Sequence, residues 1–210
     1  MIKNQKGFTL TELIAGIGLV SLLFVGFTIF LIQFVNNFKE INEFNTLQHE
    51  LLSTIEAMRY GYVKVGVNEN ESLIGLMTAN KVNIATNGKA VTITPIVTKA
   101  GERHWANYTL SPKGEIVLSA VYGIKSINNE VIFPKSKEVI DKALKYRITN
   151  FYIANSSPVV SNDISLVTIT IEGQVRFRPK ASGQNREEDQ RLNTRTARFE
   201  TTVFISNYDK

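Results

Sequence analysis

The sequence contains no cysteine, only two histidines and only five prolines. Without cysteine the chain forms no disulfide and offers no thiolate ligand to a metal. The two histidines, His49 and His104, are far apart in the sequence and could at most join carboxylates at a metal. A lone histidine of this kind is most often structural or exposed to solvent. Scarce proline, together with twelve phenylalanines and seven tyrosines, argues against a disordered tail.

Motifs that carry chemistry are also missing. We find no serine–histidine–aspartate order, no P-loop and no Rossmann glycine pattern. The chain is therefore predicted not to be an enzyme, with no catalytic residue, no cofactor and no metal site. The acidic run Glu187-Glu188-Asp189 lies between Arg186 and Arg191. Three consecutive acids face one cation only when a loop folds around it, so a solvated charged loop is favoured over a calcium site.

Positive charge is in small excess. The net charge is +5, and the basic residues are spread along the chain rather than clustered, so nucleic acid is an unlikely partner. Lys3 and Lys6 precede an apolar run, whereas residues 39–59 hold two basic and four acidic residues. By the positive-inside rule, the N-terminus is predicted to be cytoplasmic and the remainder exported.

Charge is absent altogether from Leu13 to Phe38. Those 26 residues form a helix of about 39 Å at 1.5 Å per residue, and a bilayer core needs only about 20 residues. A secretory signal has a shorter apolar region of about 7–15 residues before a small-residue cleavage site. We therefore predict a retained single-pass transmembrane helix over residues 8–35.

One acidic residue, Glu12, lies a single turn inside this apolar helix. An ionised carboxylate at membrane depth costs several kcal/mol and usually has a partner. The nearest candidate is a cation at the start of the same helix in a neighbouring chain. Cleavage after Gly7 would supply one, because it would make the nitrogen of Phe8 a free amino group.

The stretch Gly7-Phe8-Thr9-Leu10-Thr11-Glu12 resembles the class III signal peptide of type IV pilins and pseudopilins, although Thr11 stands where an aliphatic residue is usual. The resemblance implies a seven-residue leader over residues 1–7 that prepilin peptidase removes between Gly7 and Phe8. It also implies N-methylation of Phe8 and pairing of Glu12 with the Phe8 nitrogen of an adjacent subunit during filament assembly. The alternative is a plain signal anchor that tolerates Glu12 near the interface.

Helical periodicity continues past the membrane segment. Apolar residues recur at spacings of three or four, which predicts an amphipathic helix over residues 36–60 with one buried face. That face comprises Phe38, Ile41, Phe44, Leu47, Leu51, Ile55 and Met58. No proline or glycine lies between Phe27 and Tyr60, and Gly61 is a plausible stop.

From residue 61 to residue 210 the pattern predicts a β-rich domain. Strands are expected over residues 91–98, 104–110, 115–121, 147–154, 166–178 and 196–206, with a hairpin turn over 111–114. Pro95 predicts an edge position for the first of these. A short helical turn is expected over residues 139–144, and a flexible polar tip over 179–193. The predicted fold is therefore α+β, with one long N-terminal helix packed on an antiparallel sheet, an order that also resembles pilin-like subunits.

The closing segment, residues 198–207, looks like the end of J-type minor pseudopilins of type II secretion. That resemblance implies a structural subunit of the pseudopilus tip or initiation complex. Its implied partners are prepilin peptidase, other minor pseudopilins or pilins, the inner-membrane assembly platform and membrane lipid. A minor type IV pilin, a competence pseudopilin for DNA uptake and an anchored binding protein remain alternatives.

Overall fold

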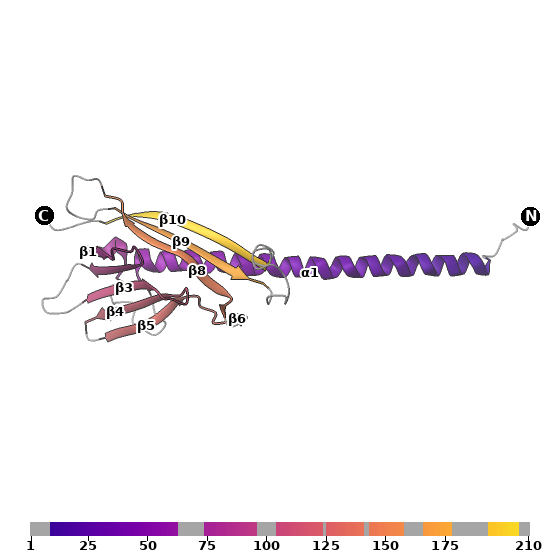
Figure 1. Ribbon diagram of the computed structural model, residues 1–210, viewed down its shortest axis with the longest axis horizontal. Helices are drawn as coiled ribbons and strands as arrows, with labels where there is room; N and C mark the ends of the chain where they lie inside the picture. The colour runs from indigo at the N-terminus through magenta and orange to yellow at the C-terminus, as the bar shows by residue number, and fades with distance from the viewer. Residues whose placement is uncertain are drawn as a thin grey trace, which may run out of the picture. The chain divides into compact units, whose positions relative to one another are not determined.

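The structure is a computed structural model that describes residues 9–62, 74–95, 104–123, 125–140, 143–157, 166–177 and 193–205. The chain divides into two compact units, Met1–Asn42 and Glu43–Lys210. Helix α1, Leu10–Tyr60, begins in the first unit and ends in the second. Figure 1 shows α1 and the strands that follow it.

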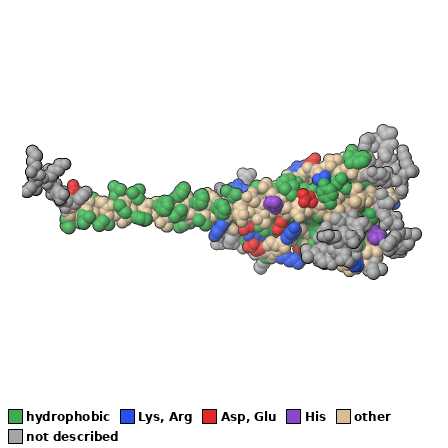
Figure 2. Space-filling view, turned by 180° about the vertical axis from the view of Figure 1, so that it is seen from behind, with side chains coloured by type: hydrophobic (Ala, Val, Ile, Leu, Met, Phe, Trp, Pro, Cys, Tyr) green, Lys and Arg blue, Asp and Glu red, His purple; other side chains and the backbone are tan. Residues whose placement is uncertain are grey.

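The first unit consists of the apolar part of α1. Its large hydrophobic side chains are exposed, for example Leu22 at 75% and Phe24 at 68%. Figure 2 shows hydrophobic side chains along this helix. By length and composition α1 can cross a membrane, and none of its most apolar window is buried within the protein. A helix that is apolar all round needs a membrane or other helices to cover it.

The second unit joins the end of α1 to three antiparallel sheets. The first sheet is a five-stranded meander in the order β1-β2-β3-β4-β5, preceded by a 3-10 turn, η1, over Leu76–Thr78. The second sheet has the order β10-β9-β8, and the third is the pair β6-β7. The strands are β1 Ala79–Ile84, β2 Ala90–Pro95, β3 His104–Leu110, β4 Ile116–Tyr122, β5 Lys125–Phe133, β6 Val139–Ile140, β7 Ala143–Leu144, β8 Tyr146–Asn155, β9 Leu166–Arg176 and β10 Thr194–Phe204.

The second half of α1 packs on these sheets through its apolar face. Leu47, Leu51, Ile55 and Met58 are all buried. Strand β9 approaches the helix at Gly173, where an added Cβ would lie 2.9 Å from a methyl carbon of Leu51. This arrangement confirms the predicted α+β class, with one long N-terminal helix packed on antiparallel sheet.

Two members of the predicted buried face are exposed instead. Phe38 is 64% exposed and Ile41 is 59% exposed, whereas Phe44 is partly buried against the core. The prediction for Phe38 and Ile41 is therefore wrong. Both residues precede Glu43, the first residue of the second unit, and so belong to the exposed helix of the first unit.

Strand β8 connects the two larger sheets through its outer edge. The backbone N–H of Ile153 donates to the carbonyl of Gly88 at 2.8 Å, and that of Ile148 donates to the carbonyl of Gly114 at 2.8 Å. Gly88 and Gly114 lie at the tips of the β1–β2 and β3–β4 hairpins and have positive φ angles of 67° and 80°. The hairpin tips therefore cover an edge that would otherwise present unpaired backbone groups.

Most of the predicted strands are present, but two local predictions are wrong. Residues 139–140 and 143–144 form the strands β6 and β7, where a helical turn was expected, and Val139 pairs with Leu144. Valine and isoleucine at the start of this segment favour extended backbone. Strand β2 lies between β1 and β3, so Pro95 is not on an edge strand but at the end of a central one, where no further ladder hydrogen bond is needed.

A candidate assembly site on the N-terminal helix

The predicted cleavage residues, Gly7 and Phe8, lie outside the described residues. Glu12 lies in the first turn of α1, where its carboxylate accepts two hydrogen bonds from Thr9. The backbone N–H of Thr9 donates to Glu12 Oε2 at 2.9 Å, and the Thr9 hydroxyl donates to the same oxygen at 2.9 Å. The Glu12 N–H is 3.4 Å from Thr9 Oγ1. This reciprocal arrangement of threonine and a glutamate three residues later is a capping box.

The cap occupies only one oxygen of the Glu12 carboxylate. Both hydrogen bonds end on Oε2, and no donor within the described part of the chain reaches Oε1. A carboxylate oxygen in an apolar environment is costly without a donor. Glu12 therefore keeps one acceptor for a group outside this helix, while its other oxygen closes the helix terminus.

A groove of about 370 Å³ runs along the helix from Glu12. It is lined by three adjacent pairs of residues that recur every four positions and so share one helical face: Glu12 and Leu13, Gly16 and Ile17, and Val20 and Ser21. Gly16 supplies no side chain, and an added Cβ there would meet nothing within 4 Å. The Ser21 hydroxyl donates to the carbonyl of Ile17 at 2.8 Å, so the groove is apolar apart from the carboxylate at its end.

The other predicted candidates form no site. No group of three or more histidine, aspartate or glutamate side chains gathers around a possible metal position among the residues described. His49 is exposed on α1, and His104 begins β3. The acidic run 187–189 lies outside the described residues.

A second charged cluster lies where α1 enters the second unit. Lys145 is only 8% exposed, and its Nζ is 2.9 Å from Glu43 Oε1 and 2.9 Å from Glu138 Oε2. The Tyr146 hydroxyl donates to Glu43 Oε2. One lysine therefore ties the helix to the segment before β6 and to the start of β8.

The pKa values in this cluster favour a charged Glu43, a charged Lys145 and a neutral Tyr146. Burial alone raises the pKa of Glu43, but hydrogen bonds from Tyr146 and Lys145 and the lysine charge outweigh it, so the net pKa is lowered. Burial lowers the pKa of Lys145, but hydrogen bonds and charges from Glu138 and Glu43 outweigh it, so the net pKa is raised. Burial and the bond to Glu43 raise the pKa of Tyr146. The cluster therefore stabilises the fold at neutral pH.

Replacing Lys145 with methionine should lower the free energy of unfolding at pH 7 by about 1–3 kcal/mol, since it leaves two carboxylates near a poorly hydrated position. In the wild type, the Glu43 contribution is present above its ordinary pKa of 4.5 and is lost as the pH falls through the lowered value. In Lys145→Met, the free energy of unfolding should therefore decrease less than in the wild type over the same fall in pH. Urea unfolding of the full-length chain in detergent, followed by circular dichroism from pH 2.5 to 8, measures both effects. Lys113→Met, in an exposed turn, is the control; equal effects from the two variants would contradict the role of Lys145.

Comparison with known proteins adds to this geometry. Residues 2–28 match the family model described as the prokaryotic N-terminal methylation motif. The chain carries the prokaryotic N-terminal methylation motif. The matched residues include Gly7, Phe8 and Glu12, and the capped carboxylate and all the residues that line the groove lie within them.

A type IV-like pilin from Thermus thermophilus aligns in structure with a TM-score of 0.41 and 12% sequence identity, over 64% of this chain and 90% of that one. A search of curated proteins found no match. The methylation motif covers only the first part of α1 and does not extend into the second unit.

The sequence interpretation missed two of these features. The Thr9–Glu12 cap was available from the sequence, because threonine followed three residues later by glutamate before an apolar run is the capping-box pattern. The cluster around Lys145 was not, because Glu43 and Lys145 are 102 positions apart and only the packing of α1 on β8 brings them together.

Proposed function

We propose that the chain is a structural minor pseudopilin, a subunit of the tip or initiation complex of a type II secretion pseudopilus. Prepilin peptidase cuts the precursor between Gly7 and Phe8, and the new Phe8 nitrogen is methylated. Glu12 then pairs with the Phe8 nitrogen of a neighbouring subunit. The observation that supports this proposal best is the Glu12 carboxylate, which sits in a matched methylation motif with one oxygen lacking a donor among the described residues.

Before assembly, the subunit waits in the cytoplasmic membrane. Its uncharged helix spans the bilayer, with the N-terminus in the cytoplasm and the second unit on the other side. The capping box reduces the cost of holding Glu12 near the apolar layer, because Oε2 already has two donors. The peptide nitrogen of Thr9 survives the proposed cleavage, so the cap is retained in the mature chain.

On assembly, the second carboxylate oxygen of Glu12, Oε1, gains a hydrogen-bond donor from the neighbouring subunit. A methylated amine is a cation with N–H donors, and opposite charges that meet in an apolar environment attract strongly. The groove beside Glu12 offers room for the N-terminal helix of the neighbour, because Gly16 lets another backbone approach. The exposed apolar side chains of the first unit would be covered in the same step. The partners are therefore other pilin-like subunits and the inner-membrane assembly platform, and no catalytic step is needed.

Deleting the gene tests which filament the subunit serves. We expect secreted enzymes to accumulate in the periplasm while the number of surface pili stays unchanged, with recovery when the wild-type gene is restored. The measurement is the ratio of secreted to periplasmic enzyme activity, with pili counted by electron microscopy. Loss of pili with normal secretion would instead identify a minor type IV pilin. Loss of DNA uptake alone would identify a competence pseudopilin.

A further inference from the structure

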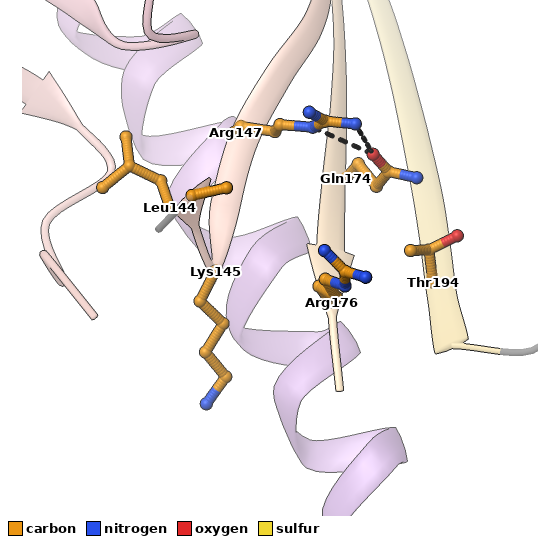
Figure 3. Close-up of a pocket in the computed structure, with 7 residues that line it drawn as sticks. Leu144, Lys145, Arg147, Gln174, Arg176 and Thr194 are labelled. Carbon is orange, nitrogen blue, oxygen red and sulfur yellow. Dashed lines mark hydrogen bonds between the residues drawn. The ribbon is translucent and has the colours of Figure 1, made fainter. Parts of the chain in front are cut away.

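Strand β10 forms one edge of the three-stranded sheet, because the strand order is β10-β9-β8. Figure 3 views one end of this sheet beside a small cavity, with Arg147 of β8, Gln174 of β9 and Thr194 of β10 on neighbouring strands. The opposite edge, on β8, is covered by the two hairpin tips described above. Strand β10 is 11 residues long and pairs with β9 over its whole length without a bulge. A long and regular edge of this kind is a template for a further strand.

The backbone groups of β10 that face away from β9 follow from hydrogen bonds at the end of the sheet. The N–H of Phe177 donates to the carbonyl of Asn193 at 3.0 Å, so this pair is bonded across β9 and β10. The N–H of Arg176 donates instead to the carbonyl of Lys145, on the β8 side. Bonded and non-bonded pairs alternate along an antiparallel ladder. The even-numbered residues of β10 therefore direct their N–H and C=O groups outward, and we consider five of them: Thr196, Arg198, Glu200, Thr202 and Phe204.

These five outward residues are accessible. All of them are exposed, whereas Ala197 and Val203, on the other face of the strand, are buried in the core. Their side-chain hydrogen bonds stay within the sheet: Thr202 bonds to Thr168, and Glu200 to Arg198. In the described part of the chain, no backbone hydrogen bond joins the outer side of these residues to another segment.

The charges on this edge are complementary to those of a second copy. Arg198 and Glu200 are two positions apart, so they lie on the same face of the strand, 3.2 Å from each other. If two copies of β10 pair antiparallel about a two-fold axis at Phe199, Arg198 of each copy lies opposite Glu200 of the other. The same register places Thr196 opposite Thr202. Opposite charges and threonine pairs directly across a ladder are both stabilising.

Charge also selects this register over its neighbours. A shift of the second copy by two residues keeps the backbone groups aligned but moves the two-fold axis to Arg198 or to Glu200. The first shift places arginine opposite arginine, and the second places glutamate opposite glutamate. Like charges directly across a ladder are destabilising. An axis at Phe199 is therefore favoured over both.

We propose that β10 pairs with β10 of a second copy of this chain, antiparallel and about a two-fold axis at Phe199. The two three-stranded sheets then form one continuous sheet. Thr196 with Thr202 and Arg198 with Glu200 make four pairs by symmetry, and each pair exchanges two backbone hydrogen bonds. Phe199, which is partly buried, lies opposite Phe199 of the second copy as an aromatic pair. This contact goes beyond the proposed function, because it uses only the second unit and needs no leader cleavage.

Cysteine cross-linking of the full-length precursor in neutral detergent tests the register. The precursor is purified from cells that lack prepilin peptidase, so no amine at Phe8 is available to Glu12. The chain has no cysteine, so Thr196→Cys and Thr202→Cys each carry a single thiol. Opposite residues of a bonded pair have Cα atoms about 5.5 Å apart, within reach of a disulfide. In either variant alone, the two thiols lie six residues apart, about 20 Å.

Mild oxidation should therefore give at least about fivefold more covalent dimer in an equal mixture of the two variants than in either variant alone. Equal amounts in the mixture and in the single variants would indicate random collision and overturn the proposal. Absence of a dimer from the mixture, with circular dichroism unchanged from the wild type, would also overturn it. Capture of a different polypeptide without the mixed dimer would exclude a second copy as the occupant.

Charge reversal in the same mixture tests the complementarity. Glu200→Arg places arginine opposite Arg198 at two positions and should lower the yield of mixed dimer about tenfold. Arg198→Glu combined with Glu200→Arg exchanges the two charges and should restore the yield to within about twofold. Failure of the exchanged pair to restore the dimer would contradict the register. Each of these outcomes is independent of Glu12 pairing, so it can be told apart from a failure of the proposed function.

Discussion

Replacing Glu12 with leucine should leave the chain in the membrane but lower its recovery with neighbouring subunits at least about tenfold. Leucine cannot pair with the Phe8 amine of a neighbour, and an unpaired cation in an apolar contact costs several kcal/mol, whereas about 1.4 kcal/mol already changes an equilibrium tenfold. The measurement is co-purification of tagged subunits from detergent-solubilised membranes, normalised to the amount of each subunit in the membrane. Thr11→Val, which changes the adjacent residue to an aliphatic one, should assemble normally.

Glutamine at position 12 separates the helix cap that the structure shows from the charge pairing that we propose for Glu12. Its amide oxygen can still accept the hydrogen bonds from Thr9, but it carries no charge. We expect Glu12→Gln to assemble as poorly as Glu12→Leu, because charge pairing between subunits is the part that both variants lose. Normal assembly of Glu12→Gln together with failure of Glu12→Leu would contradict the pairing, and would leave helix capping as the function of this residue.

A cysteine placed in the groove should cross-link subunits efficiently. The chain contains no cysteine, so a single substitution gives a disulfide only between copies or with an introduced partner. Ser21→Cys is nearly isosteric and lines the groove beside Gly16. After mild oxidation of whole membranes, we expect most of Ser21→Cys to migrate as a covalent dimer on non-reducing gels, because a neighbouring helix would bring two such cysteines close together. Combining it with Glu12→Leu should abolish the dimer.

Leu22→Cys provides the matched control on the opposite face of the same helix. At about 100° per residue the groove residues cover roughly half of the helix surface, and position 22 lies near the middle of the other half. It should cross-link at least about fivefold less than Ser21→Cys under the same oxidation. Equal cross-linking from both faces would mean random collision in the membrane and would contradict the groove as the helix contact.

The candidate site was largely predictable from the sequence because its parts are local. The uncharged run, the glutamate one turn inside it and the preceding Gly7 lie within a few turns of one helix, where spacing alone determines which residues share a face. The exposure of Phe38 and Ile41 could not be predicted from residue spacing. Periodicity shows that a helix has an apolar face, but not where along the helix a sheet begins to cover it.

In the sheets too, local sequence patterns predict some strands, whereas others depend on pairing with a neighbouring strand. The long strands β9 and β10 alternate apolar and polar residues, and Val167, Ile169 and Val203, on their apolar faces, are buried. Strands β1 and β5 went unpredicted because they lack that alternation, as in the polar stretch from Lys125 to Glu130. Their extended backbone comes from pairing with β2 and β4, which is a property of the assembled sheet. The position of β10 at a sheet edge likewise depends on the strand order of the assembled sheet.

The role proposed for Glu12 requires a free amine at Phe8, and that amine exists only if the first seven residues are removed. The most direct measurement is the intact mass of the protein purified from the membranes of cells that express prepilin peptidase. The account predicts the mass of residues 8–210 plus one methyl group, with the full precursor mass in cells that lack the peptidase. A precursor mass that persists in wild-type cells would contradict the account, because no cation would then be available at the start of the neighbouring helix.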